Sequence, residues 1–491
     1  MSDKKTYYNL VAENPQSTVV AEYYKLADRV RDGVSYQSEA DLERAFIKQL
    51  ETQAYEYLAI TSEADLVLNL RLQLEKLNSF TFTDSEWEQF FVSELANPNQ
   101  SIAEKTATIQ EDHIKNLTRE DGTTKNVYLI KKDNIHDNSL QVINQYATDL
   151  PAGRQETGQR ANRYDVTVLV NGLPLVHIEL KRRGVAIQEA FNQINRYSRE
   201  SFRASSGLFE YAQLFIISNG THTKYYSNTV RLEHIKEAGE GAVKKGKRSS
   251  NSFEFTSWWA DATNRPITDL MDFAKTFFAK HALLNILTKY CVFTTDRQLL
   301  AMRPYQIVAT ERILNRIEVS ANYKKLGTVE AGGYIWHTTG SGKTLTSFKT
   351  AQIVSKLSYV DKVLFVVDRK DLDYQTMKEY DKFEKGAANS NTSTAILKKQ
   401  LEDSNSRIII TTIQKLDHFI KRNSKHALFG GHIVLIFDEC HRSQFGDMHT
   451  AITKTFKNYN LFGFTGTPIF AINASAGGRP DLKTTEQAFG E

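Results

Sequence analysis

The sequence contains little of several residue types that mark particular protein classes. Two cysteines, Cys291 and Cys440, among 491 residues cannot build a disulfide framework, and they fit a reducing compartment. Only eight prolines, with 41% hydrophobic and 24% charged residues, exclude a disordered or fibrous chain. The amino terminus lacks the apolar run of a signal peptide, and no later stretch reaches the roughly 18 apolar residues of a membrane span. We therefore expect a cytoplasmic protein with no membrane partner.

An excess of charge of either sign is also missing. Lys and Arg total 62 against 58 Asp and Glu, a formal charge of +4, so the overall balance neither demands nor excludes a polyanionic partner. Any argument for nucleic acid must therefore be local. The stretch 238–251 has no apolar periodicity and predicts a flexible loop. Its four basic residues can touch DNA phosphates, although a solvated surface loop is the more common interpretation.

Two patterns of hydrophobic spacing divide the chain, whose length suggests about three domains. Residues 1–230 mix helical spacing, in 38–58 and 85–95, with alternation of period two in 164–181. A helical segment at 266–290 follows. Beyond it, short apolar runs bounded by polar turns alternate with helices, which is typical of buried parallel strands in an α/β sheet. These runs lie at 333–336, 362–367, 407–412, 433–437 and 460–464.

A candidate phosphate-binding loop, residues 337–344, follows the first of these strands, and an amphipathic helix continues through Val354. In such a loop, glycines let backbone N–H groups close around the β-phosphate, Lys343 reaches the β- and γ-phosphate oxygens, and Thr344 ligates Mg²⁺. His337 stands where the usual pattern has glycine. The residues expected to bind the nucleotide are Gly340, Ser341, Gly342, Lys343 and Thr344.

Two acidic residues follow a later strand. Asp438 and Glu439 come directly after the run 433–437, and ligands bind at the carboxyl ends of strands in open α/β sheets. We expect Asp438 to hold the water shell of Mg²⁺ and Glu439 to orient or deprotonate the attacking water. Upstream, Pro304 opens a helix, and the amide of Gln306 can pair with both edges of adenine.

The order of these segments resembles the first motor lobe of superfamily 2 DNA translocases over about residues 302–470. The matching segments are Gln306, 337–344, 411–414, 438–441 and 465–468. The phosphate loop with its preceding Trp336 resembles specifically the motor of type I restriction enzymes. That resemblance implies ATP and Mg²⁺ as cofactors, translocation on double-stranded DNA, and a nuclease domain ahead of the motor. It also implies methyltransferase and specificity subunits as partners, with S-adenosylmethionine bound only through the methyltransferase.

A nuclease site can be argued from spacing alone. The alternating run from Asp165 reaches Asn171-Gly172, a strong hairpin turn signal, and a second strand then leads to Glu179 and Lys181. The two carboxylates lie at similar distances from the turn, so they can meet across the hairpin, while Glu179 and Lys181 share a face.

Opposed carboxylates repel unless a cation separates them, and oxygen ligands suit Mg²⁺. The metal can polarise a scissile phosphate, while Lys181 stabilises the developing charge or positions the water. An exposed, salt-bridged hairpin is the structural alternative for Asp165, Glu179 and Lys181.

Further residues favour the nuclease interpretation. Gln193 and Tyr197 stand four apart on the next predicted helix, hence on one face, and resemble an element of RecB-like nucleases and type I restriction subunits. The family's first nuclease helix carries an acidic residue near the metal. Here Glu43 is the expected residue and Glu39, on the same face, is the second choice, with an ordinary solvated acid as the alternative. Residues 258–261 resemble the segment that joins nuclease to motor and are expected to serve packing.

We therefore expect an α/β chain with a PD-(D/E)xK-type nuclease domain and one RecA-like motor lobe built on a parallel sheet. The expected domains are an endonuclease domain at 1–260, a helical linker at 261–300, a first motor lobe at 301–470 and, at 471–491, the start of a connection to a second lobe. The few residues after Pro468 are too short for that lobe, which needs about 150.

The expected function is that of the restriction subunit of a type I restriction-modification complex, which translocates DNA with ATP and cuts it. One alternative is a stand-alone superfamily 2 translocase or helicase whose degenerate nuclease domain only binds DNA. A non-catalytic subunit that recruits partners through a nucleotide-switched lobe is an alternative of another class.

Overall fold

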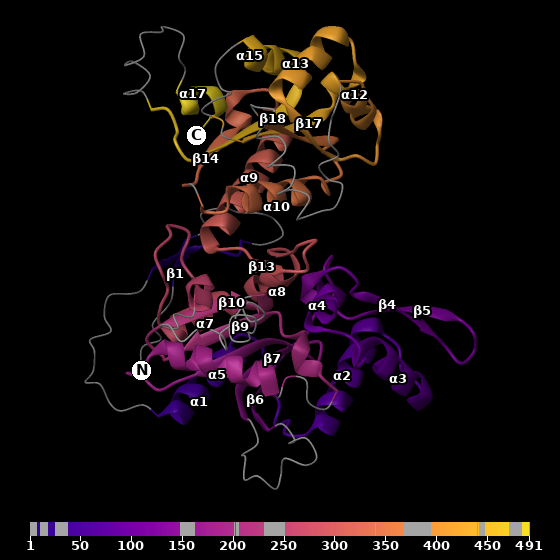
Figure 1. Cartoon of the computed structure of the whole chain (residues 1–491), viewed down its shortest axis with the longest axis vertical. Helices are drawn as coiled ribbons and strands as arrows, with labels where there is room; N and C mark the ends of the chain where they lie inside the picture. Colours follow the sequence, from indigo (N-terminus) through magenta and orange to yellow (C-terminus); the bar gives the residue numbers. More distant parts are fainter. Residues whose placement is uncertain are drawn as a thin grey trace, which may run out of the picture. The chain divides into compact units, whose positions relative to one another are not determined.

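In the computed structural model, the chain forms two compact units (Figure 1). The first unit is formed chiefly by residues 19–293 and 297–305, and the second chiefly by 306–491. The structure describes residues 7–9, 18–24, 38–147, 163–200, 202, 206–229, 251–338, 340–367, 394–438, 440, 447–470 and 484–490. The loop predicted at 238–251 lies outside these residues, apart from its last position.

Within the described residues, the first unit is built on a mixed seven-stranded sheet of order β11-β10-β9-β8-β7-β6-β3. Its strands are β3 (Glu56–Tyr57), β6 (Leu140–Ala147), β7 (Arg163–Val170), β8 (Leu173–Leu180), β9 (Leu214–Ser218), β10 (Thr223–Ser227) and β11 (Ser257–Trp258). β6, β7 and β8 are antiparallel neighbours, and β8 pairs with β9 in parallel. Every residue of β8 is buried, so β8 forms the centre of this sheet.

Helices and small hairpins surround this sheet. The helices are α1 (Glu39–Glu51), α2 (Glu63–Asn78), α3 (Asp84–Phe90) with a π-helical turn at Phe91–Leu95, α4 (Ile102–Gln110), α5 (Ile187–Glu200), α7 (Leu270–Phe277) and α8 (Lys280–Thr288). The hairpins pair β1 (Tyr7–Asn9) with β2 (Glu22–Tyr24), β4 (Ile114–Thr118) with β5 (Thr124–Tyr128), and β12 (Cys291–Phe293) with β13 (Leu299–Ala301). The helical spacing predicted at 85–95 and 266–290 is confirmed, whereas the helix predicted over 38–58 ends at Glu51 and is followed by β3 at Glu56–Tyr57. Trp259 is buried edge-on against Phe277, which is a packing role.

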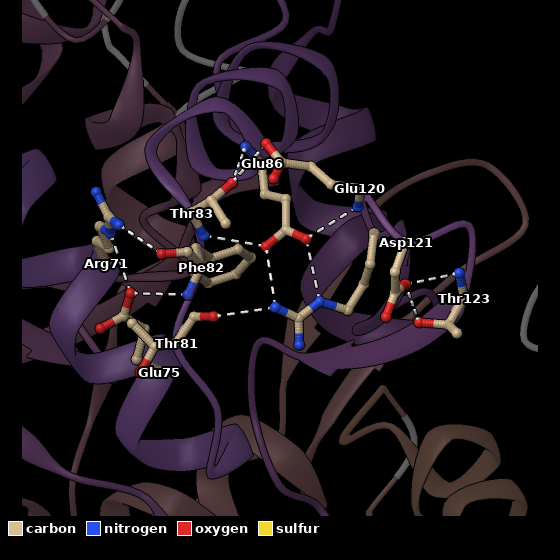
Figure 2. Close-up of polar contacts among 10 residues, drawn as sticks. Arg71, Glu75, Thr81, Phe82, Thr83, Glu86, Glu120, Asp121 and Thr123 are labelled. Atoms are coloured by element: carbon tan, nitrogen blue, oxygen red, sulfur yellow. Dashed lines mark hydrogen bonds and ion pairs between the residues drawn. The ribbon is translucent and has the colours of Figure 1, made fainter.

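A polar network joins α3 to the β4–β5 hairpin (Figure 2). Glu86 closes a capping box with Thr83 at the start of α3 and also accepts hydrogen bonds from the Arg119 side chain and the Glu120 backbone. The Arg119 guanidinium holds the pKa of Glu86 below its ordinary value. Because one carboxylate caps the helix and binds the hairpin, the two elements are fixed together.

The Asn171-Gly172 turn joins β7 to β8, as predicted. Both residues have positive φ, 52° and 84°. The Asn171 side chain donates to Leu129 O at 3.1 Å and accepts from Ser139 N at 2.9 Å, so it holds neighbouring segments as well. A Cβ on Gly172 would lie 2.6 Å from Leu70 Cα, which leaves no space for a side chain.

We predict that Gly172→Ala destabilises the first unit, because alanine disfavours positive φ by about 1–2 kcal/mol and its Cβ would also collide with Leu70. Gly122→Ala is the matched control, since Gly122 has φ 80° and no atom lies within 4 Å of the place that its Cβ would take. Urea unfolding should show a larger loss of free energy for Gly172→Ala than for Gly122→Ala. Equal losses would contradict the steric argument.

In the described part of the second unit, five parallel strands form a sheet of order β14-β18-β17-β15-β16. They are β14 (Gly333–Trp336), β15 (Lys362–Val367), β16 (Ile408–Thr412), β17 (His432–Asp438) and β18 (Asn458–Thr465), and they confirm the five predicted strands. The helices are α9 (Pro304–Asn322), α10 (Lys343–Val354), α12 (Thr394–Glu402), α13 (Ile413–Arg422), α15 (Asp447–Thr455) and α17 (Thr485–Phe489).

Alternate residues of these strands enter two separate hydrophobic cores. In β15, Leu364 and Val366 pack with residues of α12, α13 and α15, whereas Val363 and Phe365 pack with residues of α9 and α10. Helices therefore cover both faces of the sheet (Figure 1). This arrangement leaves the carboxyl ends of the strands as the place for a ligand. Across the part of the chain that the structure describes, no helix combines the length and apolar character needed to cross a membrane.

Candidate functional sites

The β7–β8 hairpin brings Asp165 and Glu179 together. Val166 pairs with Ile178 in this hairpin, so the next positions outward are Asp165 and Glu179. Leu180 N donates to Asp165 Oδ2 at 2.9 Å, which holds that carboxyl over the end of β8. Glu179 is fully buried. The two carboxyl groups therefore meet across the hairpin, in the arrangement that their spacing predicts.

Lys181 joins this pair from the same face of β8. Its Nζ donates to Glu179 Oε1 at 3.1 Å and to Leu180 O at 3.0 Å. It also lies 3.8 Å from Glu39 Oε1, and its side chain is only 14% exposed. The ammonium group of Lys181 thus lies against the buried carboxylate of Glu179 and close to Glu39 of α1.

The pKa values of both carboxyl groups at this site are raised above their ordinary values. Burial, followed by the charge of Glu179, raises the pKa of Asp165 from 3.8 to about 7. Burial also raises the pKa of Glu179 from 4.5 to about 7, although Lys181 opposes this. Ionising both groups near neutral pH is therefore unfavourable unless a cation compensates.

The donor set fits a Mg²⁺ ion. Asp165 and Glu179 offer oxygen ligands, and Glu179 Oε2 has no hydrogen-bond partner among the described residues. No group of three or more His, Cys, Asp or Glu side chains is arranged to hold a metal in the part of the chain described. Two carboxylates suffice for Mg²⁺, because this ion usually keeps several waters and binds through one or two carboxylates.

Helix α1 supplies both acidic candidates of the first helix. Its Ser38 cap accepts from Asp41 N, as the predicted start requires. Glu43 is 6% exposed; burial raises its pKa, and the nearby charge of Asp165 raises it further. Glu39 is half-exposed and lies beside Lys181 instead. The structure therefore places Glu43 within the electrostatic reach of Asp165, and Glu39 beside Lys181.

Gln193 and Tyr197 form a supporting pair on α5. Gln193 Nε2 donates to the Tyr197 hydroxyl, which donates to Arg163 O at 2.8 Å. Arg163 begins β7, two residues before Asp165. Burial raises the pKa of Tyr197, so its hydroxyl stays protonated and able to donate. The pair therefore fixes the start of the strand that carries Asp165.

Sequence reasoning missed His177. This residue is fully buried, with Nε2 3.7 Å from Glu179 Oε2 and Nδ1 3.2 Å from Thr167 Oγ1. The signal was present, because the period of two that aligns Glu179 with Lys181 also includes His177. It also missed Asn144 and Gln145 of β6, whose amides donate to the carboxylate of Glu43.

In the second unit, the loop after β14 has the backbone of a phosphate-binding loop. Gly340 and Gly342 have φ of 80° and 82°, and Gly342 caps α10, which begins with Lys343 and Thr344. Backbone N–H groups at the start of a helix attract anions. Ser341 O accepts the amide of Gln306. Thr339 lies outside the described residues.

Gln306 is packed against this loop. It is buried, and its Nε2 donates to Ser341 O at 3.0 Å. A Cβ on Gly342 would lie 2.5 Å from that nitrogen and would displace the Gln306 amide, and the φ of 82° also favours glycine at 342. Gln306 thus supports the loop backbone, and its pairing with adenine stays a prediction. Burial and the charge of Lys343 lower the pKa of His337 to about 4, which keeps this side chain neutral.

Asp438 lies at the same edge of the sheet as the loop. β18 stands between β14 and β17, and it pairs Thr465 with Trp336 and Phe464 with Asp438. Two strand spacings, about 10 Å, therefore separate the start of the loop from Asp438. A nucleotide with its metal spans such a gap. Glu439 and His441 lie outside the described residues, so the role expected of Glu439 stays a prediction.

Comparisons with known proteins match both units. The family described as type I restriction enzyme R protein N terminus matches residues 36–234, and SWI2/SNF2 ATPase matches residues 305–491. The chain is 41% identical over 465 residues to the type I restriction enzyme SsaAORF53P endonuclease subunit of Staphylococcus saprophyticus, covering 93% of this chain and 45% of that protein. It is 48% identical over 293 residues to the EcoprrI endonuclease subunit of Escherichia coli, covering 60% of this chain and 86% of that protein. The chain thus spans about half the length of the longer curated relatives.

The raised pKa values of Asp165 and Glu179 predict a pH-dependent stability. Because the folded state holds these protons more tightly than the unfolded chain, this contribution to stability is present in acid and is lost as pH rises through about 7. Mg²⁺ competes with the protons, so it should raise the unfolding temperature more at pH 8 than at pH 5.5. Calorimetry with MgCl₂ or EDTA measures this. Asp165→Asn should remove most of the Mg²⁺ effect, and an undiminished effect would place the ion elsewhere.

Proposed function

Because the chain belongs to the family of type I restriction enzyme endonuclease subunits, we propose that its first unit cleaves double-stranded DNA and its second unit uses ATP to translocate that DNA. The observation that carries the nuclease assignment is the convergence of Asp165, Glu179 and Lys181 at one buried strand end. The phosphate-loop backbone before α10 supports the motor assignment.

In the nuclease site, Asp165 and Glu179 would hold Mg²⁺, with Glu43 beside them. The ion, when bound, supplies a Lewis acid for the scissile phosphate and lowers the pKa of a bound water. Lys181 contributes a fixed positive charge next to Glu179, where it stabilises the charge that develops on the phosphate oxygens. Tyr197 and Gln193 keep the start of β7 in place. Reaction at phosphodiester bonds therefore depends on charges that the ends of β7 and β8 hold in fixed positions.

In the motor site, backbone N–H groups from Gly340 to Gly342 would surround the β-phosphate of ATP, and Lys343 would neutralise its β- and γ-oxygens. Thr344 and Asp438 would hold the Mg²⁺ that accompanies ATP. Glu439 would orient the attacking water. These roles require a loop of fixed shape, and the hydrogen bond from the Gln306 amide to Ser341 O helps to fix it.

The proposed partner subunits are inferred from the family to which the chain belongs. We propose that this subunit works in the cytoplasm with methyltransferase and specificity subunits, and that S-adenosylmethionine enters only through the methyltransferase. Recognition of a DNA sequence is then the task of the specificity subunit. A stand-alone translocase with a degenerate nuclease domain is the alternative that the next experiment distinguishes.

We predict that Lys181→Ala in the assembled enzyme abolishes cleavage and leaves ATP hydrolysis near normal, because Lys181 and the phosphate loop belong to different units. Arg44→Ala is the control, since it removes an equal charge from an exposed position of α1. Linearisation of unmodified circular DNA is the assay. Cleavage by the Lys181→Ala enzyme would refute the role given to Lys181, whereas a wild-type enzyme that hydrolyses ATP without cutting DNA would favour the degenerate-domain alternative.

We predict that Lys343→Ala lowers ATP hydrolysis by at least about 10²-fold, the usual weight of a charge that stabilises the transition state. Cleavage should fall with it if cutting requires translocation. Lys356→Ala, an exposed lysine just beyond α10, is the matched control. Displacement of a triplex-forming strand at the normal rate by the Lys343→Ala enzyme would refute the role given to this lysine.

A further inference from the structure

Strand β6 contains a backbone conformation that strands rarely adopt. Gln145 has φ 52°, in the left-handed region that disfavours every residue except glycine, and less strongly asparagine and aspartate. On either side of it, Asn144 pairs with Val166 and Tyr146 pairs with Tyr164, so the register with β7 is kept. Gln145 therefore stands opposite Asp165, and the strained residue lies at the nuclease site.

The consequence of this conformation is that two consecutive side chains reach one carboxylate. In a regular strand, neighbouring side chains point to opposite faces of the sheet. Here Asn144 Nδ2 donates to Glu43 Oε1, and Gln145 Nε2 donates to Glu43 Oε2. The left-handed turn at Gln145 breaks the alternation, so each oxygen of Glu43 receives one amide donor.

The orientation of this amide pair is fixed from the other side. Tyr57 of β3 donates its hydroxyl to Asn144 Oδ1 at 2.9 Å, which leaves the Asn144 nitrogen facing Glu43. Amides are neutral donors. They can therefore hold the carboxylate of Glu43 in place without cancelling its charge, whereas an arginine or lysine partner would make it a poorer partner for a metal ion. A carboxylate also retains further lone pairs after accepting two hydrogen bonds.

We propose that Asn144 and Gln145 are positioning residues that hold the carboxylate of Glu43 next to the cation site of Asp165 and Glu179, where its negative charge favours a bound cation. The inference rests on the proposed nuclease function. It explains why strain is kept at Gln145: a regular strand would present only one of the two amides to Glu43. Strained backbone of this kind persists where the surrounding structure and the site require it.

The test is the binding of Mn²⁺ alone to the full chain, followed by electron paramagnetic resonance. Gln145→Gly keeps the backbone conformation, because glycine adopts positive φ freely, but removes one donor from Glu43. The half-saturating Mn²⁺ concentration should rise at least about tenfold, as for lost partners of metal ligands elsewhere. The thermal unfolding midpoint without metal should stay unchanged or rise.

Ala54→Gly is the matched control. Ala54 also has positive φ, 66°, in the same unit just after α1, but its side chain has no amide. It should show the same change in stability and unaltered Mn²⁺ binding. Wild-type Mn²⁺ binding by Gln145→Gly would overturn the proposal.

Two reference variants separate this proposal from the function on which it rests. Asp165→Asn should weaken Mn²⁺ binding; if it does not, the cation site and the nuclease assignment fail together. In a Glu43→Gln background, Gln145→Gly should have no further effect on binding. A persistent effect in that background would show that Gln145 acts by another route, including general destabilisation, and would also overturn the proposal.

Discussion

Repulsion between two carboxylates at one strand end is the constraint on which the first unit depends. The β7–β8 pairing sets Asp165 against Glu179, and the surrounding strands are apolar, so water screens the pair poorly. Such a pair persists only if the structure around it is stable enough to hold it. The tight turn at 171–172, the aromatic side chains packed around Tyr164 and the hydroxyl of Tyr197 provide that stability. The positive φ of Gln145 is a second unfavourable feature at this site. Such features are expected at functional sites, where the rest of the structure is stable enough to maintain them.

The two units solve opposite electrostatic problems. The first unit places two carboxylates close together, and a cation would reduce the repulsion between them. The second gathers backbone N–H groups and Lys343 at the start of α10 and therefore calls for an anion. In each case the buried sheet supplies rigidity, and the charged groups stand where strands end. In the proposed function, a metal ion between the carboxylates and a DNA phosphate would satisfy the first arrangement, and a nucleotide phosphate would satisfy the second.

The parts of the fold that follow from local pattern could be predicted from sequence. The Asn171-Gly172 turn fixed the hairpin, and the period of two then set Asp165 against Glu179. Five apolar runs predicted the five strands of the second unit. Residues whose role depends on tertiary packing could not be assigned in this way. Glu39 and Glu43 lie one turn apart on the same face of α1, so their different neighbours, Lys181 for Glu39 and Asp165 for Glu43, depend on where α1 packs, which no periodicity reveals.

Gln145 and Gln306 show the same limit more sharply. A strand pattern assumes alternation, so it cannot foresee a left-handed residue that turns two neighbouring amides to one side. The contact of Gln306 with Ser341 joins positions far apart in sequence, and only the packed structure reveals that this amide supports the loop. The residue pattern of each segment was enough to predict its secondary structure, but it did not show which distant residues the segment contacts.

The attachment of β14 to β18 has a mechanical consequence. The strands are parallel and paired from Gly333 to Trp336, and two further hydrogen bonds continue beyond the strand: His337 N to Thr465 O, and Trp336 Nε1 to Gly466 O. A pull along the chain after Thr465 would load this ladder in shear, so several hydrogen bonds would share the force instead of opening one after another. The segment after Thr465 is therefore rigidly linked to Trp336 and His337 at the start of the phosphate loop. A force on either segment is transmitted directly to the other.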